Sequence, residues 1–349
     1  MRPDIKSWRA ALRARDAWLD KGRSAGILLG GGLLMGLAPV NAWPLAWVAM
    51  VPLWQLSSSA PSFRAALIGA GVWGIAYHGT ALSWIVWWLE PLLAMGVPWF
   101  GGILLALFAW IFITLWGAAI GMTWMALLWG VTRWRPVSGW RRLLVGTALW
   151  CAVEWVWSKG PLYWTSLSYT QSPGNLWGLQ WGQLSGPIGV TAAIVLVNGV
   201  LAESVLVKEG ALKSKRTWIV IAIAMFLSFH LVGWGAYARP LQDIEARSLS
   251  VGLIQGNIPT SEKLTSAGVQ KSRQAYLEGY EKLANEGAQL IVTPEGALPE
   301  PWNAFTQSRN FIMRAVVQRQ VPLLLGTFAH KAIDDNQSPL AQSLLMLAP

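Results

Sequence analysis

The sequence has little cysteine, histidine or charge. One cysteine among 349 residues, Cys151, excludes an internal disulfide and a cysteine-rich metal cluster. The histidines His78, His230 and His330 are far apart, so we expect neither a zinc site nor any cofactor. Only 13% of residues are charged, about half the share of roughly 25% that is usual in soluble domains. Because 54% are hydrophobic, the chain cannot be a single water-soluble globule.

The net charge of +10 is confined to the apolar part of the chain. Residues 1–237 hold 24 of the 25 tryptophans, with 17 basic and 7 acidic residues. Residues 238–349 hold 10 basic and 10 acidic residues. Basic excess in a soluble protein would suggest nucleic acid, but here it belongs to the apolar part, so we expect a membrane protein with no nucleic-acid partner. We expect a basic amino-terminal segment over 1–24, a membrane domain over 25–237 and a water-facing domain over 248–349.

Seven apolar stretches predict about seven membrane spans. A span needs about 20 helical residues, so the first two stretches, interrupted by Pro39 and Pro44, are short. The fourth stretch is long, and we take it as one span. The stretches run approximately over Ala25–Val40, Trp43–Leu56, Ala65–Trp88, Val97–Gly130, Leu143–Trp157, Pro187–Val207 and Thr217–Tyr237.

Basic residues fall almost entirely on one side of these spans. In alternate connecting segments, sixteen basic residues lie on one side and only Lys159 on the other. Such an excess marks the cytoplasmic side, so we expect a cytoplasmic amino terminus and, after seven crossings, residues 238–349 on the opposite side. The alternative is a cleaved signal peptide ending near Asn41. The next apolar stretch follows almost at once, which favours an uncleaved first span.

Few polar side chains lie inside the stretches: His78, Glu154, Asn198 and Glu203. An ionisable group within a membrane is a functional hypothesis by default. However, both glutamates lie near stretch ends, and His78 lies among glycines that let helices pack closely, so packing is favoured over direct chemistry. A transporter would need acids and bases repeated along several spans.

Aromatic residues indicate where the chain meets the membrane boundary. Most tryptophans, Trp54 among them, lie near stretch ends, where an indole sits well at the headgroup level. The loop Ser158–Gly186 is uncharged after Lys159 and rich in aromatic and hydroxyl side chains. We expect this loop to lie in the interface, where it could grip a lipid.

The water-facing part alternates strand-like and helix-like segments, which predicts an α/β layered domain. Glu295 directly follows a strand-like run, at the strand end where open α/β sheets usually carry their chemistry. It could act as a general base, although a solvated loop acid is the simpler interpretation of the pattern. Strands are expected over Ser248–Ile254, Gln289–Thr293, Pro322–Gly326 and Ser343–Leu347, and helices over Val269–Glu286 and Thr306–Gln320.

Two segments carry a family resemblance. Val251–Pro259 (VGLIQGNIP) and Leu290–Pro299 (LIVTPEGALP) resemble the opening of the carbon–nitrogen hydrolase (nitrilase-like) domain of bacterial apolipoprotein N-acyltransferases. In the apolar part, Trp43–Leu53 and Glu154–Trp155 agree with that family. The resemblance implies a multi-pass protein of the bacterial inner membrane, with seven spans leading to a periplasmic nitrilase-like domain.

The resemblance also implies a Glu–Lys–Cys catalytic triad, in which Glu295 matches the glutamate that acts as general base. The cysteine would carry an acyl chain as a thioester, and the lysine would stabilise the oxyanion. The implied acyl donor is a phospholipid, and the acceptor is the amino-terminal diacylglyceryl-cysteine amine of an apolipoprotein. No cofactor is implied, and we expect a monomer.

The lysine and cysteine of that triad have no match in this sequence. Lys331 stands in a polar turn, Cys151 stands in an apolar stretch, and Leu264 replaces a tryptophan that is frequent in the family. We therefore expect only the first part of the nitrilase-like domain, with an uncovered sheet edge and apolar face, and no activity of this chain alone. The alternatives are a degenerate, non-catalytic membrane binding or assembly protein and, less favoured, a transporter.

Overall fold

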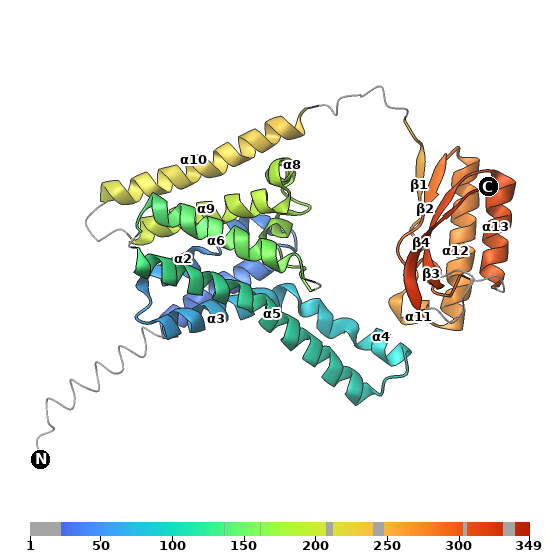
Figure 1. The fold of residues 1–349 in the computed structure, drawn as a ribbon, viewed down its shortest axis with the longest axis horizontal. Helices are drawn as coiled ribbons and strands as arrows, with labels where there is room; N and C mark the ends of the chain where they lie inside the picture. Colours follow the sequence, from blue (N-terminus) through green and yellow to red (C-terminus); the bar gives the residue numbers. More distant parts are fainter. Residues whose placement is uncertain are drawn as a thin grey trace, which may run out of the picture. The chain divides into compact units, whose positions relative to one another are not determined.

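The computed structural model describes residues 22–135, 137–160, 162–206, 212–239, 248–302, 306–330 and 339–349 (Figure 1). Most of the predicted basic segment and Lys331 therefore lie outside the described residues. The chain divides into two compact units. The first comprises Met1–Val86 and Leu105–Leu241, and the second comprises Trp87–Leu104 and Gln242–Pro349.

The first unit is helical. Among the described residues, three helices are long and apolar enough to cross a membrane: α5 (Trp99–Trp134), α9 (Pro187–Leu206) and the segment Ser214–Tyr237 of α10 (Leu212–Tyr237). The start of α5, up to Leu104, is assigned to the second unit. The count of seven spans thus remains a prediction. The other helical segments are Gly22–Leu37, η1 (Trp43–Trp47), α2 (Val51–Ser59), α3 (Phe63–Ala81), η2 (Ser83–Trp88), α6 (Trp140–Trp157), η3 (Leu167–Gln171), α7 (Leu176–Leu179) and α8 (Gly182–Ser185).

Two apolar stretches show how local sequence sets helix length. The fourth stretch forms one unbroken helix of 36 residues, α5, as predicted. The second forms two short elements, η1 and α2, each with a proline in its first turn. Proline starts a helix well but cannot continue one, since it lacks the N–H donor. The nine residues of α2 extend about 13 Å, well short of an apolar core of about 30 Å.

Small residues bring α3 and α5 into close contact. A Cβ added at Gly74 would lie 2.8 Å from the Cα of Ala118, and one added at Gly117 would overlap the ring of His78. The His78 side chain is buried, and its Nδ1 lies 2.9 Å from the Gly74 carbonyl oxygen. This arrangement confirms the packing role favoured for His78 and the glycines around it.

A tryptophan core joins the helices of the first unit. Trp54, Trp73, Trp124 and Trp150 are all buried, and Trp54 and Trp124 meet edge to face with ring centroids 5.1 Å apart. The prediction that the Trp54 indole lies at the headgroup boundary was wrong, because this side chain is fully buried between helices. Its N–H finds a hydrogen-bond acceptor inside the protein. Three of these indoles donate instead to backbone carbonyls of other segments, those of Val195 (3.1 Å), Ala49 (3.0 Å) and Gly146 (2.7 Å).

In the described residues of the second unit, four strands form a mixed sheet in the order β1-β2-β3-β4. β1 to β3 run parallel, and β4 pairs antiparallel with β3. The predicted strands and helices are confirmed with small shifts in their ends. The elements are α4 (Leu89–Ala94), β1 (Val251–Leu253), α11 (Thr260–Lys263), α12 (Ser266–Asn285), β2 (Leu290–Val292), α13 (Gln307–Arg319), β3 (Leu323–His330) and β4 (Leu340–Leu347).

The sheet has one covered face and one open face. On the covered face, Ile291 and Leu325 belong to a buried cluster with Tyr280 of α12 and Val316 of α13. On the open face, several apolar side chains are exposed, among them Leu253 at 75%. The expected apolar face is thus present. Because β1 to β3 are parallel, their carboxyl ends lie at the same edge, which is where Glu295 follows β2.

Candidate functional site

The turn that carries Glu295 is fixed to strand β3. The Thr293 hydroxyl accepts a hydrogen bond from the Gly326 N–H (3.0 Å) and donates one to the Leu324 carbonyl (3.3 Å). Farther along, the Leu298 N–H donates to the Gly326 carbonyl (3.1 Å). These bonds hold the backbone on both sides of Glu295 against one strand.

Two glycines make this close approach possible. Gly296 has φ = +57°, a left-handed conformation that favours glycine. A Cβ at Gly326 would overlap the Pro294 carbonyl oxygen and lie 3.1 Å from the Cα of Glu295. Because residue 326 of β3 has no side chain, the turn that carries Glu295 can lie directly against this strand.

The Glu295 side chain is exposed, and no hydrogen bond or ion pair reaches its carboxylate from the described part of the chain. Two nitrogen atoms lie beside the same turn: Lys263 Nζ and Gln342 Nε2 are 3.6 and 3.5 Å from the position of a Cβ at Gly296. An exposed carboxylate with an ammonium and an amide nearby can accept a proton and bind a polar substrate.

Lys263 and Gln342 were not predicted as site residues. Lys263 follows the VGLIQGNIP segment within a few residues, so that segment was a usable signal. Gln342 reaches the site only through the antiparallel pairing of β3 and β4, where it stands opposite Phe328. Leu264, just after Lys263, is 59% exposed. Lys331 lies outside the described residues.

Glu154 is fully engaged in a buried cluster. Its carboxylate accepts hydrogen bonds from Ser166 Oγ (2.6 Å), Thr191 Oγ1 (2.8 Å) and Trp150 Nε1 (3.0 Å). The side chain is 2% exposed. These donors belong to α6, α9 and the segment before η3, so Glu154 joins the 158–186 loop to the helices.

Further polar side chains of this loop point inward as well. Trp47 Nε1 donates to Gln171 Oε1 (3.0 Å), and Asn175 Nδ2 lies 3.0 Å from His230 Nε2. In contrast, Trp164 and Trp177 of the same loop are about half exposed. The sequence predicted the exposed aromatic side chains of the loop. It did not predict that the amide and hydroxyl side chains of the loop would form hydrogen bonds to the helices of the first unit.

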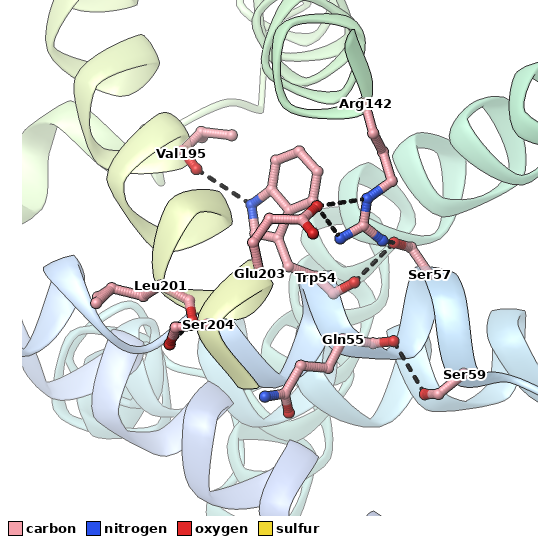
Figure 2. A network of polar contacts seen from close by, with 9 residues as sticks. All are labelled: Trp54, Gln55, Ser57, Ser59, Arg142, Val195, Leu201, Glu203 and Ser204. Carbon is pink, nitrogen blue, oxygen red and sulfur yellow. Dashed lines mark hydrogen bonds and ion pairs between the residues drawn. The ribbon is translucent and has the colours of Figure 1, made fainter. Parts of the chain in front are cut away.

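Glu203, whose side chain is 14% exposed, forms an ion pair with the buried Arg142 that the sequence did not reveal (Figure 2). Arg142 Nη2 and Nε lie 2.6 and 3.0 Å from Glu203 Oε1. Arg142 Nη1 also donates to Ser57 Oγ (3.4 Å), and the guanidinium lies 5.9 Å from the centroid of the Trp54 ring. The sequence predicted for Arg142 only a place among the basic residues of a connecting segment. The pair joins α6 to α9, which are far apart in sequence.

The remaining polar candidates of the first unit also have structural partners. Asn198 Nδ2 donates to the carbonyls of Ala46 and Ile194, both at 2.9 Å, and its Oδ1 accepts from the Met50 N–H (2.9 Å). In the described part of the chain, the residues that could bind a metal, Cys151 among them, do not form a cluster. Cys151 is a partly buried free cysteine in α6. Within the described residues, no three His, Cys, Asp or Glu side chains are grouped to hold a metal ion.

The apolar helices and the mixed sheet define a helical membrane protein that also carries an α/β unit. Residues 29–200 match the family model described as "Apolipoprotein N-acyltransferase N-terminal domain". The chain belongs to the apolipoprotein N-acyltransferase family.

Curated relatives with this name share much of the sequence. An apolipoprotein N-acyltransferase of Nostoc sp. is 43% identical over 308 residues, which cover 85% of this chain and 59% of the relative. One of Synechocystis sp. is 38% identical over 322 residues, covering 85% and 62%. One of Thermosynechococcus vestitus is 39% identical over 312 residues, covering 89% and 58%. The chain thus spans about three fifths of the length of these relatives.

Proposed function

We propose that this chain supplies the membrane domain and the general base of an apolipoprotein N-acyltransferase. The reaction transfers an acyl chain from a phospholipid to the amino-terminal diacylglyceryl-cysteine amine of a lipoprotein. The observation that carries the proposal is Glu295: an exposed carboxylate on a fixed turn, at the carboxyl end of a parallel strand, within the family-like segment LIVTPEGALP. The names of the relatives support the reaction class.

In the proposed reaction, Glu295 accepts the proton of a cysteine thiol, and the thiolate attacks the ester carbonyl of the phospholipid. The lysophospholipid leaves, and the acyl group remains on sulfur as a thioester. The lipoprotein amine then attacks the thioester, which forms the amide and releases the thiol. A covalent intermediate suits this exchange, because it stores the acyl group while one lipid leaves and another arrives. The family's cysteine and lysine have no match among these 349 residues, so the proposal assigns only Glu295 here.

The same proposal includes an arrangement in the membrane. The membrane domain covers residues 25–237 with seven spans, and residues 248–349 form the first part of a nitrilase-like domain. The basic excess on one side supports a cytoplasmic amino terminus, with residues 238–349 on the periplasmic side of the bacterial inner membrane. The protein acts as a monomer on lipid substrates.

The test is acylation in cells that lack their own N-acyltransferase and express a chimaera, in which this chain is joined to the part of the Nostoc relative that it does not cover. That part is expected to supply the lysine and cysteine of the family. Mass spectrometry of a reporter lipoprotein measures the fraction with an N-acylated terminus. We expect acylation by the unaltered chimaera and by its Glu286→Gln variant, which changes an exposed acid at the end of α12. Glu295→Gln should reduce the rate about 100-fold or more, since general-base catalysis contributes about 10²–10⁴.

Two outcomes would count against the proposal. Acylation by Glu295→Gln at the unaltered rate would exclude Glu295 as the base. No acylation by the unaltered chimaera, with the protein present in the membrane, would favour the alternative of a non-catalytic binding or assembly protein.

A further inference from the structure

An apolar groove lies where three helices of the first unit meet. It is formed by the helix Gly22–Leu37, by α2 and by α3, and it has a volume of about 470 Å³. Sites for small organic ligands commonly measure about 300–1,000 Å³. Most of the lining is aliphatic, including Leu28, Leu56, Ile68 and Val72. Its dimensions and lining fit a hydrocarbon chain.

The groove is polar at one end. Ser24, Gln55 and Ser59 line it close to the residues at which Gly22–Leu37 begins, α2 ends and α3 begins. The apolar lining extends to Val72, nine residues into α3 and therefore about 13 Å farther along. The groove thus has a polar end and an apolar body, which matches the headgroup and the acyl chain of a lipid.

Gln55 is the polar side chain that the fold leaves available. In the described part of the chain, no hydrogen bond reaches its side-chain amide, whereas its backbone carbonyl accepts from Ser59 Oγ (2.9 Å). Figure 2 shows the Gln55 amide extended away from the Arg142–Glu203 pair. An amide can donate to a phosphate or ester oxygen.

Two arginines adjoin lining residues of the groove in the sequence. Arg23 directly precedes the lining residue Ser24, and Arg64 directly precedes the lining residue Ala65. Both arginines are exposed, and the lining contains no acidic residue. Basic pockets between membrane helices commonly bind anionic lipid headgroups.

We propose that this groove is a binding site for an anionic phospholipid. One acyl chain lies along Leu28, Ile68 and Val72, Gln55 donates to the phosphate–glycerol region, and Arg23 and Arg64 neutralise the headgroup. The lipid is held rather than consumed, since the site involves none of the groups assigned to acyl transfer. The inference does not depend on the proposed function.

Native mass spectrometry of the purified chain in detergent tests this site, with phosphatidylglycerol and phosphatidylcholine of identical acyl chains as probes. We expect phosphatidylglycerol to bind more tightly. The double variant Arg23→Gln/Arg64→Gln should weaken its binding about 25-fold, since each arginine near a membrane surface contributes about fivefold. The matched control is Lys215→Gln/Arg216→Gln, which removes two exposed charges from α10 and should leave binding within about twofold.

Crosslinking gives a second measurement that needs no variant. Phosphatidylglycerol with a photoreactive acyl chain should label the helix Gly22–Leu37 and the first half of α3 before other helices. Equal binding of the two lipids would overturn the proposal, as would equal losses in the two double variants. Labelling spread evenly over α5 and α10 would show only the lipid that surrounds any membrane protein.

Discussion

The acids of the two units differ in what surrounds them. In the first unit, Glu154 accepts three hydrogen bonds and Glu203 is paired with Arg142. In the second unit, Glu295 is exposed on a turn whose backbone is fixed, and no described residue binds its carboxylate. A carboxylate whose oxygens are already engaged holds segments together, whereas one that is held only by its backbone remains available for proton transfer.

The acids of the first unit are expected to affect stability, and Glu295 is expected to affect the reaction. Removing an acid of the first unit should weaken packing, because buried donors or charges lose their partner. Removing Glu295 should change the reaction and leave folding almost unaffected, because an exposed surface substitution usually changes stability by less than about 0.5 kcal/mol.

The largest stability effect is expected at Glu203. Glu203→Gln leaves the buried Arg142 guanidinium without its counter-charge, which should cost about 3–5 kcal/mol. The measurement is the thermal unfolding midpoint of the purified chain in detergent micelles, with Glu286→Gln as the control. The double variant Arg142→Met/Glu203→Leu should recover most of the loss, since apolar replacement of a buried pair is often neutral. An unchanged midpoint for Glu203→Gln would show that the pair is not structural.

A smaller effect is expected at Gly326, which allows the Glu295 turn to contact β3. In Gly326→Ala the new methyl group overlaps the Pro294 carbonyl oxygen, so the turn must move, at a cost of about 1–3 kcal/mol. Hydrogen exchange followed by mass spectrometry should show faster exchange over residues 293–298. The amides that pair β3 with β4 serve as the internal control. Unchanged exchange in the turn would mean that β3 does not hold Glu295 in place.

The smallest effect, and one that depends on pH, is expected at Tyr280. Burial raises the pKa of its phenol above the ordinary value of 10.0, and its hydroxyl donates to the Val321 carbonyl (2.7 Å). The folded state therefore keeps the proton to higher pH than the unfolded chain. This contribution to stability is complete below pH 10 and is lost as pH rises through the raised pKa.

Tyr280→Phe should cost about 1 kcal/mol at neutral pH, since it removes one buried hydrogen bond. The rate of proteolysis within residues 248–349 measures this loss. Above pH 10 the unaltered chain should become more susceptible, and Tyr280→Phe should show a smaller further increase. Equal increases in both proteins would mean that Tyr280 does not cause the alkaline loss.

Local sequence patterns predicted the second unit well. The spacing of Tyr276 and Tyr280 predicted a helix over Val269–Glu286, and α12 covers Ser266–Asn285. The strand-like run before Pro294 predicted β2, and with it the place of Glu295. These features depend on residues close in sequence, where hydrophobic periodicity reports directly on which face is buried.

The same patterns could not predict the partners within the first unit. Arg142 and Glu203 are 61 residues apart, and Trp54 Nε1 donates to a carbonyl 141 residues away. A tryptophan near a stretch end fits the headgroup boundary or a helix interface equally well, so composition did not separate the two. All basic residues of the connecting segments were likewise interpreted as markers of the cytoplasmic side, although Arg142 is buried and paired with Glu203.

The role of Glu295 is tested most directly by acyl transfer per folded molecule of the chimaera described above, with its Glu295→Gln and Glu154→Gln variants measured in parallel. The amount of folded protein is determined from the monodisperse fraction in detergent. We expect a fall of about 100-fold or more for Glu295→Gln and a specific activity within about twofold of the unaltered chimaera for Glu154→Gln. Equal losses in the two variants, or a loss for Glu154→Gln alone, would contradict this expectation.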